Sequence, residues 1–264
     1  MTAKPTLSPE ILAAITKVAS TGHLLVAMDF DGVLSPLVDR ADDARPLPES
    51  AAAMEALSRL DSTTTAMISG RALASLRAAA SPAAATLLVG SHGAEAWLGE
   101  AAPPLTLDAD QQAALNQVRT VLHDISALAP GTVLEEKPAG IVLHTRMAAD
   151  DVAEDAVTAA KEVLHKVPGV YLQDGKRVLE VTVVRAHKGE GLAFLRQATD
   201  ATAVVFAGDD VTDEDAFAVL VGEDVGIKVG YGFTQAEFRV ESPTDVSVFL
   251  EALFEARAAH LKGA

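Results

Sequence analysis

The chain has no cysteine and few aromatic residues, which make up 4% of its 264 residues. The absence of cysteine excludes disulfides, thiolate zinc sites and a cysteine nucleophile. The shortage of rings argues against surfaces that stack nucleic-acid bases and against carbohydrate platforms built from aromatic side chains. Thiol chemistry is therefore excluded, and recognition by stacking is disfavoured.

Basic residues are also scarce, because 21 Lys and Arg stand against 37 Asp and Glu and give a formal net charge of -16. Nucleic acid is therefore disfavoured as a partner, since binding it requires a basic face. An anionic substrate would be repelled by the chain as a whole. Such a substrate would need a metal ion and nearby Lys or Arg side chains.

Long apolar runs are missing too, since none approaches the roughly 20 residues that a membrane span needs. The first residues, Met1-Thr2-Ala3-Lys4-Pro5, lack the basic region and apolar core of a secretory signal. We therefore expect a cytoplasmic protein with no membrane partner. Hydrophobic residues still make up 49% of the chain, which is enough for one large core or two modest ones.

The most informative segment is Asp29-Phe30-Asp31-Gly32, which directly follows the apolar run Leu24–Met28. This pattern predicts a buried strand ending at a site, because ligands bind beyond the carboxyl ends of strands in open α/β sheets. Asp29 and Asp31 point the same way on an extended backbone, and Gly32 allows a sharp turn. Two like charges this close are costly unless a cation or a reaction needs them. An ordinary strand with an Asp-Gly turn is the alternative at this point.

Strand and helix patterns alternate in the first hundred residues and again towards the C-terminus. The predicted strands cover 24–30, 64–68, 86–89, 203–207 and 225–229, and the predicted helices cover 50–60, 72–80, 189–199, 213–220 and 244–259. This order predicts an α/β fold with a doubly wound, Rossmann-like parallel sheet.

The middle of the chain has a different pattern, with six predicted elements in the order αββαββ. They are a helix at 109–126, strands at 132–137 and 140–146, a helix at 150–167, and strands at 170–173 and 177–184. Pro138-Ala139-Gly140 and Asp174-Gly175-Lys176 are typical of hairpin turns, and the Ala101–Pro104 stretch indicates a boundary. We therefore expect a core of residues 1–100 and 186–264, with an inserted α+β domain of residues 101–185.

Three further segments at strand or helix ends carry groups that suit phosphate. Ser69 offers a hydroxyl and backbone N–H groups before a helix, and Lys188 offers a compact positive charge at a helix start. Gly208-Asp209-Asp210 adds carboxylates after a strand, with Asp213 close behind, and such oxygen-rich sites select hard cations such as Mg²⁺.

Each of these segments also has an ordinary explanation. Ser69 could lie in a plain strand-to-helix loop and Lys188 on a solvated surface, while Glu214 and Asp215 suit the first turn of a helix. We favour a site because all four segments fall at element ends in one chain order.

In this order, the four segments resemble the signature of the haloacid dehalogenase-like phosphatase superfamily. The domain inserted between Ser69 and Lys188 matches members with a type 2 cap. Further segments are similar to the trehalose-6-phosphate phosphatase family: Ser69–Arg71, Gly90–Glu95, Glu135–Pro138, Leu143–Arg146, Gly175–Val181 and Gly208–Phe217. The resemblance covers roughly residues 22–250. Val33 stands where the family usually has Thr, and we expect modest loss at most.

The resemblance implies Mg²⁺-dependent hydrolysis of trehalose 6-phosphate through an aspartyl-phosphate. Asp29 would be the nucleophile, and Asp31 the general acid and then the base. Ser69 and Lys188 would hold the phosphoryl oxygens. The implied metal ligands and their supports are Asp29, Asp31 (through its carbonyl), Asp209, Asp210 and Asp213.

Specificity would come from the cap, which would close over the substrate and exclude water. The implied sugar-binding residues are Glu135, Lys137 and Glu180 in the cap, and Arg71, His92 and Gly93 in core loops. Without the resemblance, the cap residues would be a strand face with paired charges. Glu136 lies next to Glu135 in sequence, so it is expected on the opposite face.

The partners implied are a small sugar phosphate and, functionally, a trehalose-phosphate synthase. One alternative is another type 2-capped phosphatase, acting on sucrose phosphate or mannosyl-3-phosphoglycerate. The other is a catalytically silent sugar-phosphate binder with a regulatory task.

Overall fold

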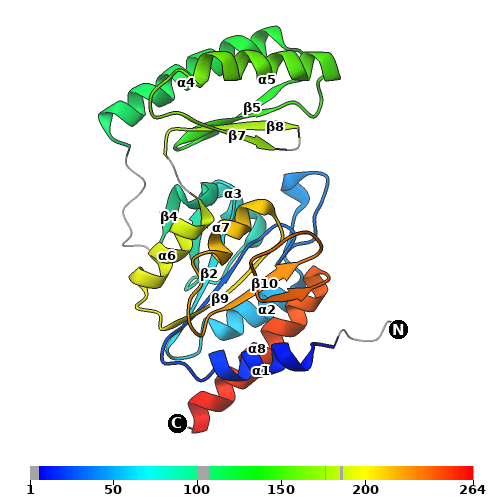
Figure 1. The fold of residues 1–264 in the computed structure, drawn as a ribbon, viewed down its shortest axis with the longest axis vertical. Coiled ribbons are helices and arrows are strands. Elements are labelled where there is room, and N and C mark those ends of the chain that lie inside the picture. Colours follow the sequence, from blue (N-terminus) through cyan, green and yellow to red (C-terminus); the bar gives the residue numbers. More distant parts are fainter. Residues whose placement is uncertain (1–5, 100–106, 176, 185–186, 264) are drawn as a thin grey trace. The chain divides into compact units, whose positions relative to one another are not determined.

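The computed structural model of the protein describes residues 6–99, 107–175, 177–184 and 187–263. The predicted boundary at 101–104, the first five residues and Lys176 of the second predicted turn lie outside these ranges. The chain divides into two compact units. Unit 1 is formed by Met1–Pro104 and Ala186–Ala264, and unit 2 by Leu105–Arg185 (Figure 1).

Unit 1 contains a seven-stranded sheet in the order β11-β10-β9-β1-β2-β3-β4, in which only β4 runs antiparallel to its neighbour among the described strands. The strands are β1 (Leu24–Met28), β2 (Thr63–Ile68), β3 (Leu87–Gly90), β4 (Glu95–Trp97), β9 (Ala203–Gly208), β10 (Val225–Val229) and β11 (Phe238–Val240). The strand order reverses between β1 and β9, where Leu24 pairs with Ala203. The predicted α/β fold with a doubly wound sheet is confirmed.

Helices cover both faces of this sheet because its central strands are apolar on both sides. In β1, Leu24, Val26 and Met28 belong to one buried cluster, and Leu25 and Ala27 belong to another. The first cluster includes residues of α1 (Pro9–Val18), α2 (Pro48–Leu57), α3 (Leu73–Ala80) and α8 (Pro243–Gly263). The second includes residues of α6 (Lys188–Ala198) and α7 (Glu214–Phe217). Three short 3-10 turns are described: η1 (Ala41–Asp43), η2 (Ser91–Gly93) and η3 (Val211–Asp213).

Three elements of unit 1 were not predicted from the sequence. They are α1, β4 and β11. β4 and β11 are three-residue edge strands, too short to show an alternating pattern. α1 does carry a readable pattern, since Ser8 caps its start and Ile11, Ile15 and Val18 are buried at helical spacing.

Two predicted elements of unit 1 are shorter in the structure. β1 ends at Met28 rather than at residue 30, because the chain turns at Gly32. The helix expected at 213–220 is a 3-10 turn followed by the single turn of α7.

Unit 2 contains an antiparallel sheet in the order β5-β6-β8-β7, with the predicted αββαββ element order. Its elements are α4 (Ala109–Leu128), β5 (Val133–Lys137), β6 (Gly140–His144), α5 (Asp150–Leu164), β7 (Tyr171–Gly175) and β8 (Val178–Thr182). Alternate residues such as Ile141, Leu143 and Leu179 form a core with α4 and α5. Glu135 and Glu180 both face Val142 across the sheet, which places them on the other side.

The first predicted hairpin turn of unit 2 is confirmed, since Lys137 pairs with Gly140 around Pro138-Ala139. In the second hairpin Gly175 pairs with Val178, so Asp174 and Gly175 belong to β7. No helix within the described ranges is long and apolar enough to cross a membrane.

Candidate active site

Asp29 follows β1 at the carboxyl edge of the sheet, next to the end of β9. Its backbone N–H donates to the Ala207 carbonyl at 3.0 Å, so the ladder to β9 fixes its backbone. Its Oδ1 accepts the N–H of Phe30 at 2.7 Å, and its Oδ2 lies 2.9 Å from Lys188 Nζ. The residue is 4% exposed. The predicted nucleophile is thus held in one place by backbone and charge contacts.

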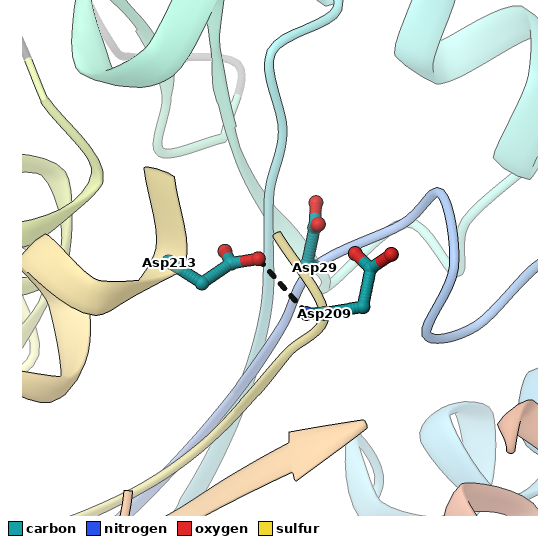
Figure 2. A group of neighbouring side chains, drawn as sticks. All are labelled: Asp29, Asp209 and Asp213. Atoms are coloured by element: carbon teal, nitrogen blue, oxygen red, sulfur yellow. Dashed lines mark hydrogen bonds between the residues drawn. The ribbon is translucent and has the colours of Figure 1, made fainter. Parts of the chain in front are cut away.

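Three carboxylates gather at this edge, from Asp29, Asp209 and Asp213, whose nearest oxygens lie within 4.8 Å of one another (Figure 2). β9 delivers Asp209 and η3 delivers Asp213. Asp213 Oδ2 accepts the N–H groups of Asp209 and Asp210, both at 2.9 Å, and its Oδ1 accepts Lys188 Nζ at 2.6 Å. Asp213 therefore joins the turn after β9 to the lysine at the start of α6.

The charges in this cluster perturb one another. Burial raises the pKa of Asp29 well above its usual range, and Asp213 and Asp209 add to the rise while Lys188 opposes it. Burial and Asp213 also raise the pKa of Asp209 to about 6. Burial alone would lower the pKa of Lys188, but the charges of Asp29 and Asp213 outweigh it and raise that pKa. The cluster is thus short of positive charge.

This donor set fits a hard divalent cation. Carboxylate oxygens are the ligands that Mg²⁺ prefers, and a second source of positive charge would relieve the crowding at Asp29 and Asp209. Glycine at position 32 leaves space for the Asp209 carboxylate, because a Cβ there would lie 2.1 Å from Asp209 Oδ2. Its φ of +78° is also one that glycine adopts readily. The sharp turn predicted at Gly32 is confirmed.

Asp31 is held by Arg71 in a two-point ion pair. Arg71 Nε donates to Asp31 Oδ2 at 2.6 Å and Nη2 donates to Oδ1 at 2.7 Å. Arg71 is itself fixed, since Nη1 donates to the Ala41 carbonyl at 2.9 Å and the guanidinium lies over the Phe30 ring at 5.3 Å. The structure therefore joins the predicted acid/base to a residue that the sequence assigned to the substrate.

Ser69 and His92 lie in two loops that the structure ties together. Ser69 follows β2, is 1% exposed, and its Oγ accepts the Arg71 N–H at 3.1 Å. Its carbonyl accepts the His92 N–H at 3.1 Å. His92 has a φ of +55° within η2, and Gly93 follows at +120°. A Cβ at Gly70 would lie 2.6 Å from the His92 ring, so the two loops approach closely.

Two residues of unit 1 that the sequence analysis discussed lie outside the cluster of Asp29, Asp209 and Asp213. Asp210 is exposed, and its side chain accepts the N–H of Asp213 as a cap on η3. Val33 is fully buried in the core, where its side chain packs against apolar neighbours.

The predicted sugar-binding residues of the inserted region all lie in unit 2, where an ion pair and a hydrogen bond hold them. Lys137 Nζ donates to Glu180 Oε1 at 2.7 Å, and His144 Nε2 lies 2.9 Å from Glu135 Oε2. The hydrogen bond with His144 lowers the pKa of Glu135. Glu136 instead bonds to Arg119 and His123 of α4. The expectation that Glu135 and Glu136 face opposite ways is confirmed.

Sequence reasoning did not single out His144, Glu214 or Lys228 as site residues. Lys228 was detectable, because a lysine within the apolar strand Val225–Val229 needs a buried partner. His144 and Glu214 carried no such signal, because a polar residue at a strand end or in a first helical turn is ordinary.

Comparisons with known proteins agree with this geometry. The sequence matches the trehalose-phosphatase family over residues 27–251. It is 33% identical over 230 residues to the trehalose-6-phosphate phosphatase of Escherichia coli, covering 85% of this chain and 84% of that protein. It is also 33% identical to the trehalose-phosphate phosphatase of Mycolicibacterium paratuberculosis, covering 88% of this chain but 62% of that longer protein.

A solved structure supports the same fold. The C-terminal domain of the C. albicans trehalose-6-phosphate phosphatase has a TM-score of 0.75 and 21% identity, covering 96% of this chain and 98% of that one.

Proposed function

Because the chain belongs to the trehalose-phosphatase family, and is therefore a phosphoric monoester hydrolase, we propose that it hydrolyses trehalose 6-phosphate to trehalose and phosphate. The observation that carries the proposal is the cluster of Asp29, Asp209 and Asp213 around Lys188. It combines a fixed carboxylate nucleophile, a cation site and a buried ammonium at one sheet edge. A trehalose-phosphate synthase would supply the substrate.

Mg²⁺ is the cation that these residues fit. The carboxylates of Asp29 and Asp209 would hold it together with the Asp31 carbonyl, while Asp213 keeps the turn after β9 in place. When bound, the ion would offset the negative charge of the phosphate and of the carboxylates around it. Asp210 would support the metal site through its backbone, whose N–H binds Asp213, because its side chain caps η3.

Asp29 would attack the phosphorus atom in line. An Asp29 oxygen forms a bond to phosphorus as the bond from phosphorus to the sugar oxygen breaks, which leaves an aspartyl-phosphate. Lys188 and Ser69 would hold phosphoryl oxygens during this step. The Lys188 ammonium suits this task because it is buried and fixed by two carboxylates.

Asp31 would move the protons. It gives a proton to the leaving sugar oxygen, and then takes one from the water that attacks the aspartyl-phosphate. Release of phosphate restores the Asp29 carboxylate. Because both Asp31 oxygens bond to Arg71 in the structure, we propose that substrate binding loosens this pair.

Recognition of the sugar would depend on charged side chains that form hydrogen bonds with its hydroxyl groups. Carboxylate and ammonium groups bind sugar hydroxyls through strong hydrogen bonds. In unit 2, Glu135, Lys137 and Glu180 supply such groups; Lys137 and Glu180 hold each other, and His144 holds Glu135. In unit 1, the loops with Arg71, His92 and Gly93 would add contacts.

A panel of sugar phosphates assayed with Mg²⁺ tests the proposal. Phosphate release from trehalose 6-phosphate should exceed release from sucrose 6-phosphate and mannosyl-3-phosphoglycerate at equal concentration. Equal rates would contradict the substrate assignment. Asp29→Asn should lower kcat by at least about a thousandfold, because the nucleophile is removed. Unchanged turnover in that variant would show that Asp29 is not the nucleophile.

A further inference from the structure

Lys228 is the fourth residue of the five-residue strand β10, and its side chain is 4% exposed. Its Nζ donates to the carbonyl of Asp209 at 2.7 Å and to that of Asp210 at 3.3 Å. It also lies 3.5 Å from Glu214 Oε1. The two carbonyls each accept a hydrogen bond from the ammonium group, and the Glu214 carboxylate lies at ion-pair distance. These contacts give the buried lysine a fixed position.

The turn that Lys228 contacts is the one that presents Asp209 to the carboxylate cluster. Its N–H groups are held on one side by Asp213 Oδ2, at 2.9 Å from both Asp209 and Asp210. Its carbonyls are held on the other side by Lys228. The peptide plane between Asp209 and Asp210 is thus held from both sides, by its N–H and by its carbonyl. Lys228 therefore fixes the direction in which the Asp209 side chain leaves the backbone.

Glu214 in turn fixes Lys228. Its Oε1 is buried and accepts no hydrogen bond from the described residues, so the nearby ammonium is its charge partner. Its Oε2 accepts the Gln235 N–H at 2.8 Å and the Thr234 hydroxyl at 3.3 Å. Glu214 was expected to support the first turn of a helix. It does start α7, but its carboxylate binds the loop after β10 instead.

We propose that Lys228 and Glu214 are positioning residues that set the affinity of the site for the divalent cation by fixing the Asp209–Asp210 turn. They would act without contacting substrate. The inference rests on the proposed function insofar as it takes Asp209 to bind Mg²⁺. Removing a residue that contacts and orients a metal ligand typically lowers the metal affinity by about 10- to 100-fold.

Calorimetric titration of the whole protein with Mg²⁺ alone tests this, because it needs no turnover. Lys228→Met keeps the length of the side chain but removes the ammonium, and should raise the Mg²⁺ Kd at least about tenfold. Glu214→Gln keeps an oxygen for Gln235 and Thr234, and should give a smaller increase. Lys161→Met removes an ammonium from the surface ion pair with Asp174, and should leave the Kd unchanged.

A second measurement separates positioning from general damage. At saturating Mg²⁺, the KM of K228M for trehalose 6-phosphate should stay within about twofold of the wild-type value, because Lys228 does not contact the substrate. If K228M does not fold, E214Q decides the question. Wild-type-like Mg²⁺ affinity in these variants would overturn the inference while leaving the proposed function intact. A wild-type protein that bound no Mg²⁺ would overturn both.

Discussion

At the level of single residues, Asp209 carries a carboxylate whose protonation depends on its surroundings. Burial and the neighbouring Asp213 raise its pKa to about 6, against about 4 for an aspartate in an unfolded chain. Below about pH 4 the carboxylate is neutral in both states, and above about pH 6 it is charged in both. Charging Asp209 therefore makes the metal-free folded state less stable as the pH rises from about 4 to about 6.

Mg²⁺ binding should show the opposite trend, because the ion needs the charged carboxylate. At pH 5 most Asp209 would be protonated, and Asp29, whose pKa is also raised, would add to the effect, so the Mg²⁺ Kd should be at least about tenfold higher than at pH 7. The rise in Tm on adding Mg²⁺ should likewise be smaller at pH 5. Thermal melts and titrations at both values measure this. The same Mg²⁺ Kd at pH 5 and pH 7 would show that the metal site holds no carboxylate with a raised pKa.

The sequence was sufficient to find residues whose position follows from strand ends. Asp29 and Asp209 meet because the carboxyl ends of the neighbouring parallel strands β1 and β9 share one edge, and Lys188 reaches them from the start of α6. It could not find the pair between Asp31 and Arg71, because that contact depends on a loop conformation that no periodicity encodes. Asp210 stays a predicted metal-site residue, and its side chain caps η3 outside the cluster of Asp29, Asp209 and Asp213.

At the level of elements, α8 holds the amino-terminal edge of the sheet through one buried arginine. Arg257 is fully buried and donates to the carbonyls of Ala19, Thr21, Gly22 and Ser62 and to the Thr63 hydroxyl. These acceptors lie in the segments that lead into β1 and β2. One side chain thereby supplies donors to the carbonyls of the two turns that lead into the central strands.

Arg257→Met should therefore destabilise the fold by about 3 kcal/mol, since it removes a set of hydrogen bonds that each contribute roughly 0.5–1.5 kcal/mol. Urea unfolding measures the loss. Arg257→Lys keeps a charge and some donors, so its loss should be intermediate. At 25 °C the folded fraction should keep its KM, because the arginine lies at the edge of the sheet away from the cluster. A loss below about 0.5 kcal/mol would show that water replaces the guanidinium.

Elements were predicted from sequence mostly where they carry a long helical period or a continuous apolar run. The long helices α4, α5 and α8 show the first, and the central strands β1 and β9, buried along their whole length, show the second. β4 and β11 lie at sheet edges and have three residues each, so pairing with a neighbour, not pattern, defines them. The end of β1 depended on the turn at Gly32, which shortens the strand by two residues relative to the prediction.

At the level of the whole molecule, the two units have separate hydrophobic cores, because the buried clusters of unit 1 and unit 2 share no residue. The carboxylate cluster belongs entirely to unit 1. Stability of unit 2 and metal binding should therefore be independent properties, as expected for groups that share no packing partners.

Leu143→Ala tests this independence, because Leu143 is fully buried in the core of unit 2. We expect a loss of about 2–5 kcal/mol in unit 2, seen as a lower transition in calorimetry, with an unchanged Mg²⁺ Kd. The matched control is Leu25→Ala in the core of unit 1, which should weaken Mg²⁺ binding as well. Equal weakening of Mg²⁺ binding by both variants would show that the units behave as one.

The pairing of β1 with β9 also determines when the site can exist during synthesis. Leu24 and Ala203 are neighbours in the sheet, yet the whole of unit 2 is translated between them. At roughly 5–20 residues per second, a ribosome needs on the order of 10–40 s to cover that stretch. For that time β1 has one open edge and Asp29 has no carboxylate neighbour from η3. The catalytic residues are thus encoded early, but the site is completed only when the last third of the chain has emerged.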